Sequence, residues 1–191
     1  MTGTNRTESA AVTRRALLDE AAALLDDGGP EAVTLRDVGA RAGVSRGAPY
    51  RHFADKKTLL TAVAAKGWDS LGERMAGAQE RAGSPSEALR AALGDVISLN
   101  RTRPHLYRLM FTTPASDPGA VARAAERTCD EFLTIVNAVV GDPDAQRCAA
   151  LLLTGVHGAA GLESSGLLRT DKWQTSAEEL TESLIAAITG S

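Results

Sequence analysis

Apolar side chains recur at every third or fourth position along most of this 191-residue chain, which is the spacing of one face of an α-helix. Sustained alternation of β-branched and polar residues, the pattern of a half-buried strand, does not occur. Glycine and proline gather between the periodic segments, as Gly28, Gly29 and Pro30 do after the first one. The pattern therefore predicts an all-α fold of about nine helices.

The turn signals between these segments predict where each helix begins and ends. The expected helices span residues 9–27, 34–43, 45–53, 55–82, 85–101, 104–112, 117–140, 143–166 and 174–189. Thr34, Ser45 and Asp55 are the expected N-caps of the second, third and fourth helices, since their side-chain oxygens can accept a first-turn amide. We expect a three-helix domain over residues 1–57, a connecting helix over 55–82, and a larger helical domain over 58–191.

Positive charge is concentrated in one short segment of an otherwise acidic chain. The formal net charge of the whole sequence is −3, yet residues 33–57 contain six Lys or Arg against two Asp. From residue 61 onward the balance reverses, with 12 Lys or Arg against 16 Asp or Glu. A basic segment on an acidic body indicates a polyanionic partner for that segment alone.

The basic segment has the pattern of a helix-turn-helix, because three short helices follow one another with a glycine, Gly43, in the second turn. Val44 and Phe53 are the apolar positions that would hold the third helix against the other two. At its start, Arg46 can offer two donors to a guanine edge in the major groove. Gly47 and Ala48 are small enough for a close approach to DNA. Residues whose donors suit phosphate oxygens surround them: Thr34, Tyr50, His52 and Lys56.

The run "TLRDVGARAGVSRGAPYRHFADKKTLL" (34–60) resembles the DNA-binding domain of TetR-type transcriptional regulators. It departs from that family at Gly39, where alanine is commoner, and at Gly47-Ala48-Pro49, which replace bulkier residues. By this resemblance, Arg36, Arg46, Gly47 and Ala48 face bases, and Thr34, Tyr50, His52 and Lys56 face the DNA backbone.

The same resemblance implies a DNA-binding transcriptional regulator, a repressor released by a small-molecule effector, that binds a near-palindromic operator in double-stranded DNA as a homodimer. The alternative is a TetR-like protein that acts as an activator, or one that binds a ligand or partner without regulating DNA.

The carboxyl-terminal helices carry the expected dimer interface. Residues 145–168 are apolar on nearly every side of their helix, which must therefore be covered on more than one face. The last helix carries one apolar stripe with glutamates outside it. Two such helices from each protomer would form a four-helix interface about a two-fold axis. The residues expected there are Leu152, Val156, Ala159, Leu180, Leu184 and Ile188.

A ligand pocket is a further expectation for this domain. The runs "RTRPHLYRLMF" (101–111) and "GVHGAAGLESSGLL" resemble a TetR-type C-terminal domain named for a Trp-His-Gly motif, although Val156 replaces the tryptophan. Large or adaptable side chains in these helices can line an apolar cavity, or can simply form the core. The candidates are Trp68, Tyr107, Met110, Phe111, Phe132 and His157.

Other classes of protein fit the sequence less well. A hydrolytic set of Ser164, Ser165, His157 and Glu163 lies too close together along one helix to form an oriented catalytic chain. His105, His157, Cys129 and Cys148 lack zinc-site spacing, so we expect no metal, no cofactor and no enzymatic activity. The first residues are polar, and no apolar run approaches the roughly 20 residues that span a bilayer. We therefore expect a bacterial cytoplasmic protein, associated with the nucleoid when DNA-bound and with no membrane partner.

Overall fold

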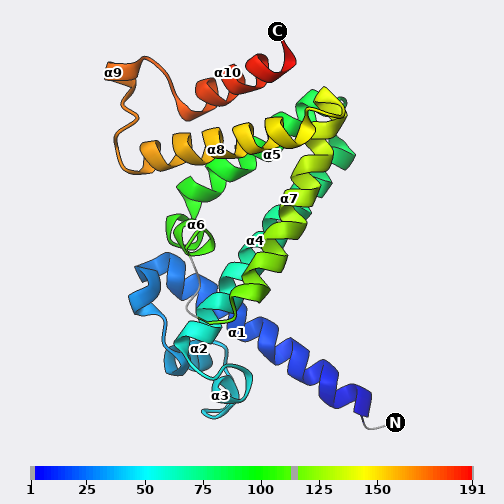
Figure 1. Ribbon diagram of the computed structural model, residues 1–191. Helices are drawn as coiled ribbons and strands as arrows, with labels where there is room; N and C mark the ends of the chain where they lie inside the picture. The colour runs from blue at the N-terminus through cyan, green and yellow to red at the C-terminus, as the bar shows by residue number, and fades with distance from the viewer. Residues whose placement is uncertain (1–2, 113–115, 191) are drawn as a thin grey trace. The chain divides into compact units, whose positions relative to one another are not determined.

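The computed structural model describes residues 3–112 and 116–190, and over these residues it is built of ten helices and no strand (Figure 1). The predicted all-α fold is confirmed. The helices are α1 (Gly3–Ala32), α2 (Leu35–Arg41), α3 (Ala48–His52), α4 (Lys56–Arg81), α5 (Pro85–Thr102), α6 (Pro104–Met110), α7 (Pro118–Val140), α8 (Ala145–Ser164), α9 (Thr170–Trp173) and α10 (Ala177–Thr189). In the described part of the chain, no helix has the length and apolarity that a membrane span requires.

The chain divides into two compact units. The first comprises the described residues of Met1–Gly67 and His105–Ala122, and the second those of Trp68–Pro104 and Arg123–Ser191. Residue contacts thus divide α4 at Gly67, inside the connecting helix that the sequence pattern predicts over residues 55–82. Helices α4 and α7 contribute residues to both units.

In the first unit, α1, α2 and α3 pack on one another around a small apolar core. Its fully buried side chains include Leu17, Leu25, Val33, Val38 and Leu59. The predicted end of the first helix is confirmed in the backbone, because Gly28 and Gly29 have non-helical angles and Gly29 has a φ of 71°.

The second helix begins and ends as its sequence predicts. Thr34 is the N-cap of α2, and its hydroxyl oxygen accepts the amide of Asp37 at 3.1 Å. Gly43 follows the helix with a φ of 65°, in the left-handed region that favours glycine.

The expectation that Ser45 caps the third helix is wrong. Helix α3 begins at Ala48, with Gly47 at the N-cap position and no side-chain cap. Instead, the backbone carbonyl of Ser45 accepts the amide of Ala48 at 2.8 Å, which closes a turn ahead of the helix. Pro49, in the first turn of α3, has no amide hydrogen for a capping side chain to accept.

The second unit is organised around α8, which packs against α5 on one side and α10 on another. Leu93, Leu152 and Val156 are fully buried between these helices. The side chain of Asn100, itself buried, donates to the carbonyl of Ala160 at 2.8 Å and so satisfies both groups away from water. On another side of the unit, the hydroxyl of Thr128 on α7 donates to the carbonyl of Trp68 on α4 at 2.7 Å.

The one helix that the sequence pattern missed is α9, because four residues are too short to display a helical period. The Trp173 indole nitrogen donates to the carbonyl of Leu167 at 3.1 Å and ties α9 to the turn before it. The helix that follows starts at a complete capping box, in which Ser176 and Glu179 each accept the other's backbone amide.

Gly39 lies too close to Pro49 to accept a side chain. A Cβ built on Gly39 would lie 2.6 Å from Cγ of Pro49, and a proline ring cannot rotate out of the way. We expect Gly39→Ala to lower the free energy of unfolding by about 1–3 kcal/mol through overpacking, as measured by urea denaturation. Gly39→Ala combined with Pro49→Ala should recover part of that loss.

Gly94 on α5 supplies the matched control, since a Cβ there meets no atom within 4 Å. Gly94→Ala should leave the stability unchanged or raise it by up to about 1 kcal/mol through helix propensity. Equal effects of the two glycine substitutions would contradict the close contact of α2 with α3.

Candidate nucleic-acid interface

Helix α3 has one face against α2 and one face in solvent. Ala48 and Pro49 are buried against the rest of the first unit, and Ala48 is only 4% exposed. Arg46 and Gly47 are exposed, and Tyr50 is 57% exposed although it is a large ring. The sequence assigned Ala48 to the base-facing set, but its methyl group points into the packing. Of the candidate residues between positions 46 and 50, Arg46, Gly47 and Tyr50 keep surface for a partner.

The two candidate base-reading arginines differ in their surroundings. Arg46 makes no hydrogen bond or ion pair with any described residue. Arg36 lies 3.4 Å from Asp37, and its side chain is 75% exposed, so this pair contributes little. Both guanidinium groups are therefore available to acceptors outside the chain.

Thr34 uses its hydroxyl within the chain. The hydroxyl donates to the Asp37 carboxylate at 2.6 Å while its oxygen accepts the Asp37 amide. This hydrogen bond from Thr34 holds the pKa of Asp37 below its ordinary value. A phosphate contact through the Thr34 hydroxyl would have to replace the bond to Asp37.

The candidate phosphate-facing residues His52 and Lys56 lie near the end of α3 and the start of α4. Lys56 is 3.8 Å from Glu31, a loose pair between exposed groups. His52 is half-buried, with its ring 6.5 Å from that of Phe53. Asp55 is the confirmed cap of α4, because its carboxylate accepts the amide of Thr58 at 2.7 Å.

Arg14 is a cation that sequence reasoning missed. Its guanidinium lies over the Phe53 ring, 5.3 Å from the centroid, so α1 adds a positive charge beside the end of α3. The two residues are far apart in sequence, and their types alone carry no signal of this contact.

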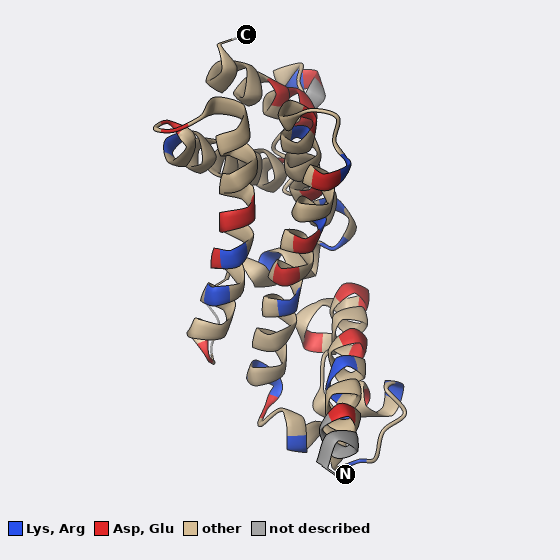
Figure 2. Cartoon of the chain, turned by 90° about the vertical axis from the view of Figure 1, so that its right-hand side faces the viewer, with Lys and Arg blue, Asp and Glu red and all other residues tan. Residues whose placement is uncertain are grey.

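A hollow of about 350 Å³ opens between α2 and α3. Arg36 and Arg46, which the family resemblance places among the base-facing residues, both line it. Its full lining is Arg36, Gly39, Ala40, Val44, Arg46, Pro49 and Tyr50. Figure 2 shows that Lys, Arg, Asp and Glu residues occur on the helices of both units. In the lining of this hollow, Arg36 has one weak ion pair and Arg46 has none with a described residue.

Comparison with known proteins decides the family. The family model described as "Bacterial regulatory proteins, tetR family" matches residues 17–63, and the model described as "Tetracyclin repressor-like, C-terminal domain" matches residues 89–188. The chain belongs to the TetR family. Its members are transcriptional regulators and not enzymes. The second model does not bear the Trp-His-Gly name, so that finer assignment stays a prediction.

Individual relatives of this TetR-family chain are also named as transcriptional regulators. It is 27% identical over 163 residues to the HTH-type transcriptional regulator BetI of Rhizobium meliloti (strain 1021), covering 81% of this chain and 80% of the relative. It is 32% identical over 97 residues to the HTH-type transcriptional repressor KstR of Rhodococcus jostii (strain RHA1), covering 51% and 45%. A solved transcriptional regulator from Rhodococcus sp. Rha1 is 28% identical with a TM-score of 0.71, covering 93% and 96%.

The candidate pocket residues of this TetR-family chain fall into both units. Tyr107 and Met110 are buried in the first unit, where the ring of Phe111 lies 4.8 Å from that of Tyr107, and burial raises the pKa of Tyr107 to about 12. Trp68 and Phe132 are buried in the second unit, where His157 is exposed.

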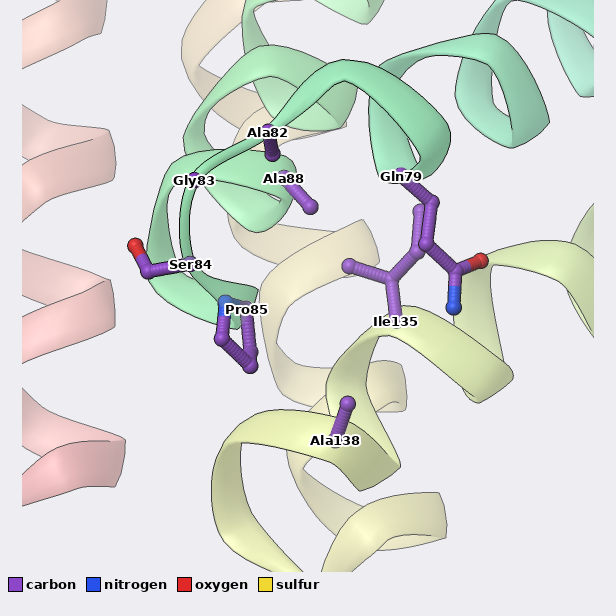
Figure 3. Close-up of a pocket in the computed structure, with 8 residues that line it drawn as sticks. All are labelled: Gln79, Ala82, Gly83, Ser84, Pro85, Ala88, Ile135 and Ala138. Carbon is purple, nitrogen blue, oxygen red and sulfur yellow. The ribbon is translucent and has the colours of Figure 1, made fainter.

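A small hollow in the second unit has a different lining. Its volume of about 210 Å³ lies below the roughly 300 Å³ at which ligand pockets begin. Figure 3 shows its residues, which come from the end of α4, the turn into α5 and one face of α7. None of the six candidate pocket residues belongs to this lining.

The six residues expected at the dimer interface divide into two groups. Leu152 and Val156 have no exposed surface, and Ala159 is buried as well, so these three side chains pack within one chain. Leu180, Leu184 and Ile188 on α10 are half-buried and keep surface that a partner could cover. Leu184 also lies against Gly155 of α8.

The residues of the imagined hydrolytic set are occupied by other contacts. The hydroxyls of Ser164 and Ser165 donate to the carbonyls of Gly161 and Leu162, each at 3.1 Å. Glu163 accepts two hydrogen bonds from Arg101 of α5. Within the described residues, no three His, Cys, Asp or Glu side chains are grouped so that they could hold a metal ion.

The carboxylate of Asp55, the N-cap of α4, should make the stability of the protein depend on pH. Hydrogen bonds from the amide and hydroxyl of Thr58 hold the pKa of Asp55 below its ordinary value of 3.8. A depressed folded-state pKa gives stability that is present above the unfolded-state pKa and is lost as pH falls through the folded-state value. We expect Asp55→Asn, which keeps a good cap without titrating, to flatten the acid side of the stability profile.

Urea midpoints of both proteins between pH 6 and pH 3 check this prediction. The difference between the wild type and Asp55→Asn should be constant near pH 6 and should shrink or reverse as pH falls below about 4. Parallel profiles over the whole range would show that Asp55 does not titrate with folding.

Proposed function

We propose that this TetR-family regulator is a repressor that binds a near-palindromic operator as a homodimer and leaves it when a small-molecule effector binds. The observation that carries the proposal is Arg46, an exposed guanidinium in the turn just before α3 without an ion pair among the described residues. Its geometry suits bidentate donation to guanine O6 and N7 in the major groove. The relative KstR, named a transcriptional repressor, supports the sign of regulation.

The exposure and the chemistry of each candidate residue support its proposed role in DNA binding. Arg46 and Arg36 read base edges, and exposed Gly47 permits a close approach of the backbone to the duplex. Tyr50, His52 and Lys56 donate to phosphate oxygens, which fixes the register of the protein without reading sequence. Ala48 acts through packing rather than through a base contact, because its side chain is buried.

Dimerisation would set the spacing of two such reading heads. A two-fold pair places two recognition helices in successive major grooves about 34–36 Å apart, which requires an operator with matching half-sites. Support for a partner surface comes from α8 and α10. Leu151, 48% exposed on α8, lines a hollow of about 640 Å³ together with Ala187 and Ile188 of α10.

An effector would release the operator only by binding more tightly to a conformation in which the two heads no longer match the half-sites. An operator is first selected as the duplex that the purified protein retains from fragments of the host genome. A reporter gene with this selected operator across its promoter then tests the sign of regulation. Expression should fall when the protein is present, whereas a rise would favour the activator alternative.

Substitutions in the reading segment test the proposed roles. Arg46→Ala should cost about 1–3 kcal/mol on the selected operator and relax the preference at one position of each half-site. Lys56→Ala should weaken binding to all sequences alike and lower the slope of log affinity against log salt by about one. Fluorescence anisotropy over a salt series, with specific and scrambled duplexes, separates the two effects.

Lys172→Ala in the second unit is the charge control and should change neither quantity. Equal losses of Arg46→Ala on the specific and the scrambled duplex would remove Arg46 from base reading.

A matched pair of leucines tests the dimer. Leu151→Glu should shift the protein toward a monomer in sedimentation velocity at micromolar concentration, because it places charge on the apolar surface of α8 beside α10. Leu167→Glu, at a 63% exposed position between α8 and α9, should leave the dimer intact. A wild-type protein that sediments as a monomer would refute the dimer itself.

A further inference from the structure

The hollow between α2 and α3 suits an apolar group at the centre of a cationic surface. The geometry points to a subsite that receives the 5-methyl group of an operator thymine, next to the base that Arg46 reads. This inference rests on the proposed function and adds a chemical requirement on the operator.

The floor of the hollow is apolar. Gly39 has no side chain, and the Pro49 ring occupies the space where its Cβ would be. Pro49 has no amide hydrogen, and the amide of Val44 already donates to the carbonyl of Gly39 at 3.2 Å. Ala40 and Val44 complete the lining with methyl groups. This floor offers few hydrogen-bond donors to the acceptors of a base edge, whereas a methyl group needs no hydrogen bond there.

The rim of the hollow is cationic and hydrogen-bonding. Arg36, Arg46 and Tyr50 line it and are exposed. Positive charge at the rim complements a polyanion, and the guanidinium groups suit guanine edges and phosphates. The occupant must therefore carry an apolar group within an anionic polymer.

Thymine is the one base of unmodified DNA that presents a methyl group in the major groove. The hollow measures about 350 Å³, which leaves room for the methyl and for part of the base edge that bears it. Arg46 lies on the same rim, so the thymine should be adjacent to the base pair whose identity Arg46→Ala relaxes.

Deoxyuridine scanning tests this subsite, because uracil differs from thymine at this edge only by the missing methyl. Each thymine of the selected operator duplex is replaced singly by deoxyuridine, and affinity is measured by anisotropy. One thymine per half-site should lose about four-fold, the transfer value of one buried carbon group of about 0.8 kcal/mol. That position should neighbour the one relaxed in Arg46→Ala.

Two variants test whether the loss of affinity on deoxyuridine substitution depends on the hollow. Ala40→Leu fills it from an exposed helical position and should bring the thymine-to-uracil ratio close to one. Val44→Thr keeps the shape but places a hydroxyl in the lining, and should lower the ratio as well. Ala91→Leu, at an exposed position of α5 in the second unit, is the matched control and should keep the wild-type ratio.

The outcomes separate this inference from the proposed function. A selected operator whose affinity is indifferent to every deoxyuridine overturns the thymine subsite and leaves sequence-specific binding in place. A sensitive thymine whose ratio is unchanged in both Ala40→Leu and Val44→Thr also overturns it. Failure to select any duplex would overturn the proposed function, and the subsite with it.

Discussion

The contact of the Pro49 ring with the bare backbone of Gly39 is the constraint on which the reading surface depends. It brings α3 against α2 so closely that a single added carbon on Gly39 would lie 2.6 Å from the ring. Because α3 has only five residues, it cannot hold its own position by helix propensity, and packing must supply it. The two departures from the usual family pattern, at Gly39 and at Pro49, thus belong to one feature, since the Pro49 ring lies where a Cβ on residue 39 would have to be.

The distribution of ion pairs explains how an acidic protein can bind an anionic polymer. Several arginines of the second unit pair with carboxylates, as Arg101 does with Glu163 and Glu178 and Arg90 does with Glu182. The hydrogen bonds that Arg101 donates to Glu163 and Glu178 raise the pKa of its guanidinium, which stays charged and links α5, α8 and α10. Arg46 has no such partner among the described residues. Whether a given arginine is paired within the chain therefore matters more for binding DNA than the net charge of −3.

Helix α8 shows how one apolar pattern can be satisfied in two ways. Its nearly all-round apolar sequence requires cover on several sides, and the sequence alone favoured a partner chain as part of that cover. Within the chain, α5 and α10 already cover Leu152, Val156 and Ala159. The surface left for a partner chain is therefore smaller than the sequence pattern predicts. It consists of the area around Leu151 and the half-buried residues of α10.

Helical period, turn residues and the basic segment at 33–57 were sufficient for the all-α fold, most helix bounds and the family, since all three depend on residues close together in sequence. Capping by Thr34 and Asp55 was equally local. The tertiary structure alone decided that Ala48 faces inward and that Arg14 lies over Phe53. It also decided that Arg36 and Arg46 share one hollow. These facts depend on how helices pack across tight turns, and a one-dimensional pattern of apolar and polar positions does not encode which face meets which.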